Sequence, residues 1–259
     1  MGICEKMVEI NMATNVSVHL DSILFLFPNL THLTFYKPLN TAKPETVANL
    51  SMFLSDFNNQ SRITLKDVNF DHMAPFLGDF GARLTHLYFS GKSTLINIDH
   101  LNSTCPNLDT IVITHSTLTM EQNDMSYDNK NMFKKLKCCK LWDIHIGAND
   151  HAWKKLLKNA KYLEELYLWN IVISDTDLDD ILNFNRLFKL QDIRIGCSEI
   201  GFVKLTDDSV TRLVRSCPDL KSIGGICDWR TRDLMSLLQN LMQEGGWKIT
   251  LENHQSTSL

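Results

Sequence analysis

One short phrase of residues recurs along this 259-residue chain and constrains its fold more than any other feature. The phrase consists of an aliphatic residue, two others, a second aliphatic residue, one other, and a third aliphatic residue or Phe. Its copies begin at Leu30, Leu84, Leu108, Leu141, Leu163, Leu190 and, in degenerate form, Leu220. From Leu84 onward, successive copies are 24, 33, 22, 27 and 30 residues apart. Such self-similarity is typical of chains that stack one small structural unit on the next.

The segments between these copies carry helical periodicity. In DTDLDDILNF, Asp177 can cap a helix whose apolar residues are Leu178, Ile181 and Leu182. Similar spacing occurs in residues 46–57, 153–160 and 209–217. One unit cannot bury its own strand and helix faces, so stacking has to bury both. The pattern predicts a right-handed α/β leucine-rich-repeat solenoid, with parallel strands inside the curve and helices outside.

The repeats set the predicted domain limits. We expect an irregular N-terminal segment at 1–17, a leucine-rich-repeat domain of about eight to nine repeats at 18–251, and a polar tail at 252–259. RITLKDV at 62–68 can supply a strand between Leu30 and Leu84, WKITL at 247–251 can supply the last one, and the polar stretch 121–131 is expected to protrude as a loop. The alternative is a doubly wound α/β domain, but neither Gly pair opens a helix after a strand.

Residues 205–223, LTDDSVTRLVRSCPDLKSI, resemble the cysteine-containing class of leucine-rich repeats. In that class a Thr-Asp pair starts the helix, and a Cys-Pro pair ends it before the Leu of the next strand. The matching residues here are Thr206-Asp207, Cys217-Pro218 and Leu220, and CPNL at 105–108 repeats the second element. A Pro at this point stops a helix because it lacks an N–H group. The resemblance covers about residues 18–251.

This resemblance implies a function in protein recognition. Repeats of this class occur above all in F-box proteins, where they form the substrate-binding part of a cullin-type ubiquitin ligase. An F-box is a segment of three helices that precedes the repeats, and no such pattern precedes Ser17. Direct binding to the ligase adaptor is therefore not expected of this chain. A truncated relative, a fragment of a longer F-box protein and a stand-alone repeat protein stay open as alternatives.

The cysteines and histidines give no pattern for a metal or a catalytic site. Seven cysteines, unevenly spaced and including the adjacent Cys138-Cys139 pair, fit no common disulfide framework, which favours a reducing compartment, the cytoplasm or nucleus. Zinc ligands are usually closely paired, and no such pair occurs. No nucleophile motif is present either. We therefore expect no metal, no cofactor and no enzymatic activity.

Charge argues against nucleic-acid and membrane partners at the level of sequence. The net charge is -4, without a long run of one sign. The densest basic stretch contains Lys134, Lys135, Lys137 and Lys140, which we interpret as a solvated edge rather than a polyanion site. No stretch has the 18 or more apolar residues of a membrane span.

Residues that flank the aliphatic positions of each strand should point onto the concave face of the sheet, because side chains alternate along a strand. They include aromatic residues and Arg, which dominate the binding energy of protein interfaces. The predicted protein-binding residues are His86, Tyr88, His145, Glu165, Tyr167, Trp169, Asp192 and Arg194. We expect a partner protein or substrate on this face. An extracellular binding repeat and, less favoured by the pattern, an enzyme are the alternative functions.

Overall fold

The computed structural model describes residues 9–13, 31–36, 62–66, 70–120, 132–145, 152–198, 203–225, 229 and 233–252. The chain forms two compact units, Met1–Glu121 and Gln122–Leu259, which are referred to below as the N-terminal and C-terminal units. The boundary between them falls at the start of the predicted insertion. That insertion, 121–131, and the predicted helix at 46–57 lie outside the described residues.

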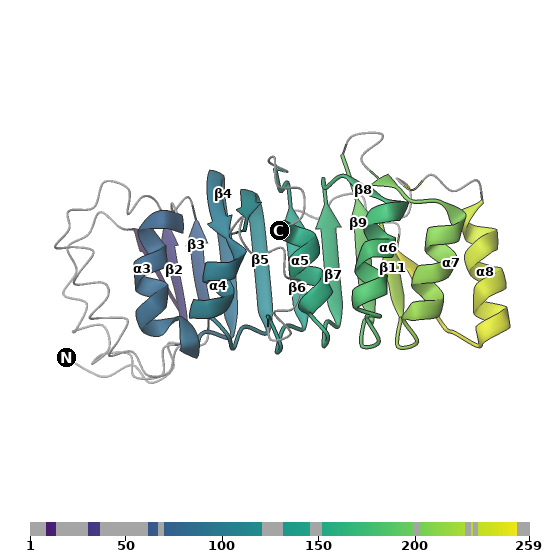
Figure 1. Ribbon diagram of the computed structural model, residues 1–259, viewed down its shortest axis with the longest axis horizontal. Helices are drawn as coiled ribbons and strands as arrows, with labels where there is room; N and C mark the ends of the chain where they lie inside the picture. Colours follow the sequence, from purple (N-terminus) through teal and green to yellow (C-terminus); the bar gives the residue numbers. More distant parts are fainter. Residues whose placement is uncertain are drawn as a thin grey trace. The chain divides into compact units, whose positions relative to one another are not determined.

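The described strands of the N-terminal unit form a parallel sheet in chain order. They are β1 (Glu9–Ala13), β2 (His32–Tyr36), β3 (Arg62–Lys66), β4 (His86–Asn97) and β5 (Thr110–Thr119). Helix α3 (Phe70–Phe80), a 3-10 turn η2 (Gly81–Arg83) and helix α4 (Ile98–Thr104) connect β3, β4 and β5 (Figure 1). The segment 1–17, predicted to be irregular, thus contains a strand: Ile10 and Met12 of β1 align with Leu33 and Phe35 of β2.

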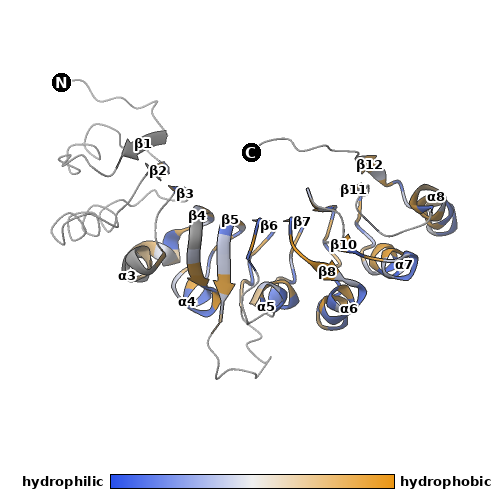
Figure 2. Cartoon of the chain, turned by 90° about the horizontal axis from the view of Figure 1, so that it is seen from above, coloured by the Kyte–Doolittle hydropathy of each residue, from blue (hydrophilic) through white to orange (hydrophobic). Residues whose placement is uncertain are grey.

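The C-terminal unit repeats the same construction. Its parallel strands, in order, are β6 (Cys138–Trp142), β7 (Glu165–Trp169), β9 (Asp192–Gly196), β11 (Ser222–Gly224) and β12 (Thr250–Glu252). A helix precedes each of the last four: α5 (Ala152–Asn159), α6 (Asp175–Phe184), α7 (Asp207–Ser216) and α8 (Leu234–Gly245). The short strands β8 (Ile173–Ser174) and β10 (Val203–Lys204) pair with each other. Figure 2 shows the four helices on one side of the strands.

The core lies between the sheet and the helices. In β3, β6, β7 and β9, the second and fourth side chains are buried, as in Leu166 and Leu168 of β7 and in Ile193 and Ile195 of β9. Helix residues such as Leu156, Ile181 and Leu213 are buried as well. The predicted fold class is confirmed. Each unit is built as an α/β leucine-rich-repeat solenoid, with parallel strands on one side and helices on the other.

The sequence placed the sixth strand wrongly. Leu141, Ile144 and Ile146 were expected to be its aliphatic positions, but β6 pairs with β7 so that Cys139 aligns with Leu166, and Leu141 with Leu168. The phrase therefore starts at Leu136, 28 residues after Leu108 and 27 before Leu163. Cys139, fully buried, takes a position where an aliphatic residue was expected. The spacing of the repeats is more regular than the sequence pattern suggested.

The turns from helix to strand explain why Cys105 and Cys217 are buried. From Leu84 onward, the amide of the first Leu of each phrase donates to the carbonyl three residues earlier, as in Leu108 to Cys105 and Leu220 to Cys217. Both thiols are buried, and burial raises the pKa of Cys105 to about 11 and that of Cys217 to about 12. A Cβ added to Gly81 would lie 2.7 Å from the sulfur of Cys105, so successive turns stack closely. Cys105, Cys217 and Gly81 therefore allow the turns to pack closely.

Polar side chains join neighbouring repeats inside the C-terminal unit. Asn185, which ends α6, is buried, and its Nδ2 donates to the carbonyls of Leu157 and Ala160 in the preceding repeat at 2.8 and 3.0 Å. Its Oδ1 accepts from the amide of Leu187. One amide group therefore satisfies backbone groups of two repeats that water cannot reach.

A second link joins the starts of α5 and α6. Helix α6 was expected to be capped by Asp177, but Ser174 is its N-cap, and Asp177 completes the capping box by accepting from the Ser174 amide. Asp177 also pairs with the buried ammonium of Lys154 in α5. Burial by itself raises the pKa of Asp177, but the hydrogen bonds from Lys154 and Ser174 outweigh it and leave that pKa lowered.

Removing the Asn185 amide should destabilise the unit strongly. Asn185→Ala removes the Asn185 partner of the buried Leu157 carbonyl and of the Leu187 amide, and it leaves the Ala160 carbonyl with only the Leu163 amide. This loss should lower the free energy of unfolding by about 2–4 kcal/mol. The control is Asn183→Ala on the exposed side of the same helix, with an expected change within about 0.5 kcal/mol. Urea denaturation followed by circular dichroism measures both. Equal losses for the two variants would show that the Asn185 contacts contribute nothing.

The capping network should also make stability depend on pH. Because the folded-state pKa of Asp177 is lowered, its stabilisation is present above the unfolded value of about 3.9 and is lost as the pH falls through the folded value. Asp177→Asn should therefore be less stable than the natural chain at pH 7, and the two stabilities should converge below about pH 4. Thermal unfolding from pH 7 to 3 tests this. A difference that stays constant over the whole range would refute the role.

Candidate functional site

The helix-free face of the sheet in the C-terminal unit presents a cluster of aromatic and charged side chains. We call it the outward face. It consists of the first, third and fifth residues of β6, β7 and β9, whose second and fourth residues are buried. The pairing register places residues about 27 positions apart on adjacent strands, roughly 4.8 Å from each other. The residues are Cys138, Lys140, Trp142, Glu165, Tyr167, Trp169, Asp192, Arg194 and Gly196.

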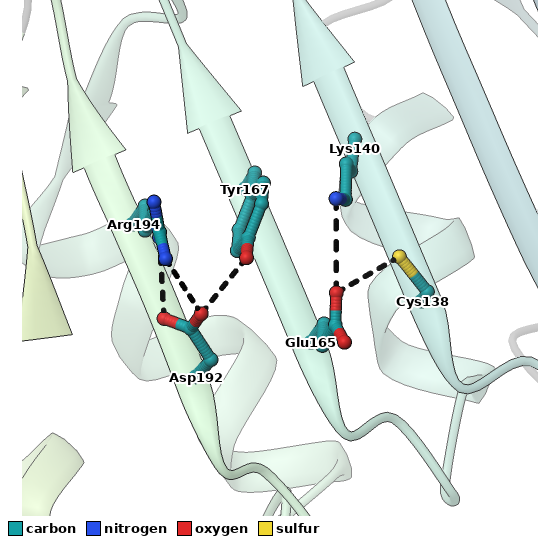
Figure 3. A network of polar contacts seen from close by, with 6 residues as sticks. All are labelled: Cys138, Lys140, Glu165, Tyr167, Asp192 and Arg194. Carbon is teal, nitrogen blue, oxygen red and sulfur yellow. Dashed lines mark hydrogen bonds and ion pairs between the residues drawn. The ribbon is translucent and has the colours of Figure 1, made fainter. Parts of the chain in front are cut away.

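Tyr167 lies in the middle of this cluster between two cations. The Lys140 Nζ is 4.2 Å from the centroid of its ring, and the Arg194 Cζ is 4.7 Å from it. The Tyr167 hydroxyl donates to Asp192 Oδ2 at 2.8 Å (Figure 3). Burial, followed by the hydrogen bond to the Asp192 carboxylate, raises the pKa of Tyr167 well above its usual range. The phenol therefore remains a neutral hydrogen-bond donor at any physiological pH.

Ion pairs fix the two cations in place. Arg194 donates to Asp192 through Nη2 at 3.1 Å and through Nε at 3.4 Å. Lys140 Nζ lies 3.7 Å from Glu165 Oε2, which also accepts a hydrogen bond from the Cys138 thiol at 3.4 Å. The two cations and two carboxylates balance each other, so this surface is preorganised and close to electrically neutral.

Two tryptophans form the other end of the cluster. The rings of Trp142 and Trp169 have centroids 5.6 Å apart and an interplanar angle of 40°, and both side chains are partly exposed. The next residue in this row, on β9, is Gly196. A Cβ there would lie 2.4 Å from Cζ3 of Trp169, so the absence of a side chain gives the indole the space it occupies. The result is an aromatic platform beside the Tyr167 cluster.

Five of the eight predicted binding residues come together here: Glu165, Tyr167, Trp169, Asp192 and Arg194. His145 does not join them. Strand β6 ends at Trp142, Asp143 adopts a positive φ of 50°, and His145 is an exposed residue in an isolated bridge beyond the strand. Cys138, Lys140 and Trp142 were not predicted to lie on this face, because the sixth phrase was placed five residues too late. The 27-residue spacing to Leu163 was the signal that could have placed them.

The remaining predicted residues, His86 and Tyr88, lie on β4 of the N-terminal unit. His86 Nδ1 is 3.4 Å from Asp109 Oδ1 and 2.8 Å from the Thr85 hydroxyl. Burial lowers the pKa of His86 more than the nearby Asp109 raises it. Tyr88 aligns with Thr64 on one side and Val112 on the other. The aromatic cluster of the C-terminal unit has no counterpart among these described neighbours.

The described residues contain no group of three or more His, Cys, Asp or Glu side chains that could hold a metal ion. Among the same residues, no helix is both long and apolar enough to span a membrane. The five described cysteines, 105, 138, 139, 197 and 217, are free thiols, and burial raises the pKa of Cys139 above its usual range.

Comparison with known proteins supports the fold. No family model and no curated protein matches the sequence. A chain in the crystal structure of the Rad7 and Elc1 complex in yeast is similar to this one, with a TM-score of 0.56 and 12% identity over 94% of this chain and 62% of that chain. This chain thus spans less than two thirds of that structure's length. The likeness shows a shared repeat fold.

Two further solved structures align with lower scores. One is a protein of Bacteroides fragilis, with a TM-score of 0.45 and 12% identity over 90% of this chain and 68% of that one. The other is a chain of the TLR13–ssRNA13 complex, with a TM-score of 0.47 and 13% identity over 86% and 32% of the two chains.

The dependence of the platform on Gly196 can be tested directly. Gly196→Ala should displace the Trp169 indole, change the near-ultraviolet circular dichroism of the tryptophan pair and lower the free energy of unfolding by about 1–3 kcal/mol. The control is Gly78→Ala in α3, where an added Cβ meets nothing within 4 Å. It should stabilise the protein by about 0.5–1 kcal/mol. An unchanged near-ultraviolet spectrum in the Gly196 variant would contradict the packing described.

Proposed function

We propose that this chain is a protein-recognition scaffold and that the outward face of its C-terminal unit binds a segment of a partner protein. The observation that carries the proposal is the Trp142–Trp169 platform, partly exposed on a sheet face that its own helices leave uncovered. Large aromatic side chains and Arg supply most of the binding energy in protein interfaces. Here they stand side by side on three neighbouring strands.

The polar contacts of the face support recognition rather than catalysis. The Tyr167 hydroxyl and the Arg194 guanidinium are both committed to Asp192, and Glu165 is committed to Lys140 and Cys138. A surface whose side chains already hold one another loses little conformational freedom when a partner binds. Its aromatic rings then give the partner a complementary contact surface, and the polar atoms around them can form hydrogen bonds with it. We infer a binding role without enzymatic chemistry and without a cofactor.

More specifically, we propose that the chain recognises substrates in an F-box-type, cullin-based ubiquitin ligase pathway, in the cytoplasm or nucleus. It is supported by the sequence resemblance of residues 205–223 and by the buried cysteines at the turns that this repeat class uses. The free thiols of the described cysteines fit a reducing compartment. Components of a cullin ligase among co-purified proteins would support this pathway.

Truncating the aromatic cluster should abolish partner capture. The test variant is Tyr167→Ala with Trp169→Ala, and affinity purification with mass spectrometry identifies the captured proteins. Each truncation at a binding hot spot costs about 2 kcal/mol or more, so the double variant should lose affinity by at least about 10²-fold. Tyr162→Ala removes an exposed tyrosine outside the outward face and serves as the control.

Both variants have to keep the thermal midpoint of the natural chain within a few degrees. The expected result is a set of partners that the natural chain and the Tyr162 variant capture and the double variant does not. If the double variant captures the same proteins at the same level, the outward face is not the binding surface.

A further inference from the structure

A second surface of the C-terminal unit lies along the edge where each helix leads into the next strand. Four turns meet there: residues 132–137, 158–164, 185–191 and 215–221. Their strands start side by side because β6, β7, β9 and β11 are parallel neighbours. In Figure 1 these turns form the lower margin of the unit. We call this surface the basic turn edge.

The basic turn edge concentrates positive charge in a chain whose net charge is -4. The four turns contain nine Lys and Arg residues but only two acidic residues, Glu164 and Asp219. Eight of the nine cations are exposed, and Lys158 is half-buried. The nine are Lys134, Lys135, Lys137, Lys158, Lys161, Arg186, Lys189, Arg215 and Lys221.

Compensation of the helix dipole accounts for only a small part of this charge. Cations favour the last turn of a helix, and only Lys158 and Arg215 lie within a helix. Among the residues that the structure describes, ion pairs also neutralise little of this charge. Lys189 pairs with Asp219 at 3.5 Å and Arg215 with Glu244 at 3.4 Å, and both pairs are largely exposed to solvent. The excess positive charge therefore projects into solvent along the edge.

Three exposed aromatic rings stand among these cations. The exposed fractions are 58% for Tyr162, 57% for Phe184 and 52% for Phe188, among the largest for apolar side chains in the described residues. Lys158 Nζ lies 4.5 Å from the Phe184 ring centroid, and Arg186 Cζ lies 5.9 Å from that of Phe188. Exposing three apolar rings to water at one edge is energetically unfavourable, and these rings contribute little to the buried core.

We propose that the basic turn edge binds single-stranded nucleic acid, with the cations contacting phosphates and the exposed rings stacking on bases. Binding sites for single strands combine a positively charged track with aromatic side chains, because an unpaired base exposes its face and a paired base does not. The turns supply one group of cations per repeat, at steps between about 4.8 Å on the strand side and about 8–10 Å on the helix side. An extended polyanion can follow such a line.

This proposal revises the interpretation of the sequence. Taken along the chain, Lys134, Lys135, Lys137 and Lys140 form one short basic stretch, which we interpreted as a solvated edge. The fold separates Lys140, which lies on the outward face, from the other three. The fold also brings six cations from the three later turns to the same edge. Each of these turns begins more than 20 residues after the previous one.

The test measures binding of the full chain to a fluorescein-labelled 20-nucleotide oligouridylate by fluorescence anisotropy at 50 and 200 mM salt. With about six phosphate contacts on a single strand, this rise in salt should weaken binding roughly 300-fold. Lys161→Glu combined with Lys189→Glu should weaken binding at 50 mM salt at least tenfold. The matched control is Lys204→Glu, an exposed lysine on β10 away from the four turns, which should stay within about twofold of the natural chain.

The aromatic contribution separates this surface from the proposed function. Tyr162→Ala and Phe188→Ala should each weaken binding of the oligonucleotide about tenfold, the loss expected for one stacked base. Tyr167→Ala with Trp169→Ala should leave it unchanged, while abolishing capture of the partner protein. Circular dichroism and thermal midpoints confirm that each variant is folded.

Several results would overturn the proposal. Absence of binding at 50 mM salt is one, and an equal loss in the Lys161/Lys189 and Lys204 variants is another. A duplex of the same sequence bound as tightly as the single strand would show simple charge attraction without stacking. Tighter binding to vesicles of phosphatidylserine than to the oligonucleotide would assign the edge to a membrane surface instead.

Discussion

The structure depends on one constraint, the fixed register between parallel strands. The described strands pair residue for residue in each printed register up to the fifth position, so Leu166 aligns with Ile193 as Ile63 aligns with Leu87. Because side chains alternate along a strand, this register sorts each repeat into an apolar set that faces the helices and a second set that faces away. A slip of one residue would exchange the two sets, and burial of the aliphatic positions opposes such a slip.

The fixed register also determines which side chains lie together on the outward face and along the basic turn edge. Residues 27 positions apart in sequence become cross-strand neighbours, which is how Lys140, Tyr167 and Arg194 form one row. It also lines up whatever each repeat carries in its turns. On such a scaffold, the residues of a binding site can therefore occupy equivalent positions of successive repeats. They need not form a motif of consecutive residues. The polar links inside the stack, such as Asn185 to the Ala160 carbonyl, hold the repeats at the spacing that these rows require.

Most of the fold and much of the outward face could be predicted from periodicity, because burial of aliphatic residues dominates both. The predicted position of the sixth strand was wrong because a cysteine occupies one of its buried positions. Cys139 packs like an aliphatic residue but was not counted as one, so the sixth strand was displaced and His145 was assigned to a strand that ends before it. The partners of Tyr167 could not be predicted either, since cation–ring and carboxylate geometry arises only after the register is fixed. The basic turn edge was hidden for the same reason: its charges are local in space and dispersed in sequence.

The two surfaces of the C-terminal unit should respond differently to ionic strength. On the outward face the cations are matched by Asp192 and Glu165, and the exposed area is aromatic, so binding there should rest on shape and desolvation. On the basic turn edge the cations outnumber the acids, so binding there should release counterions and weaken steeply with salt. Because the edge and the face are formed by different positions of the same repeats, one stack can present two chemistries without either disturbing the core. Salt dependence therefore identifies which surface a given ligand uses, independently of any mutation.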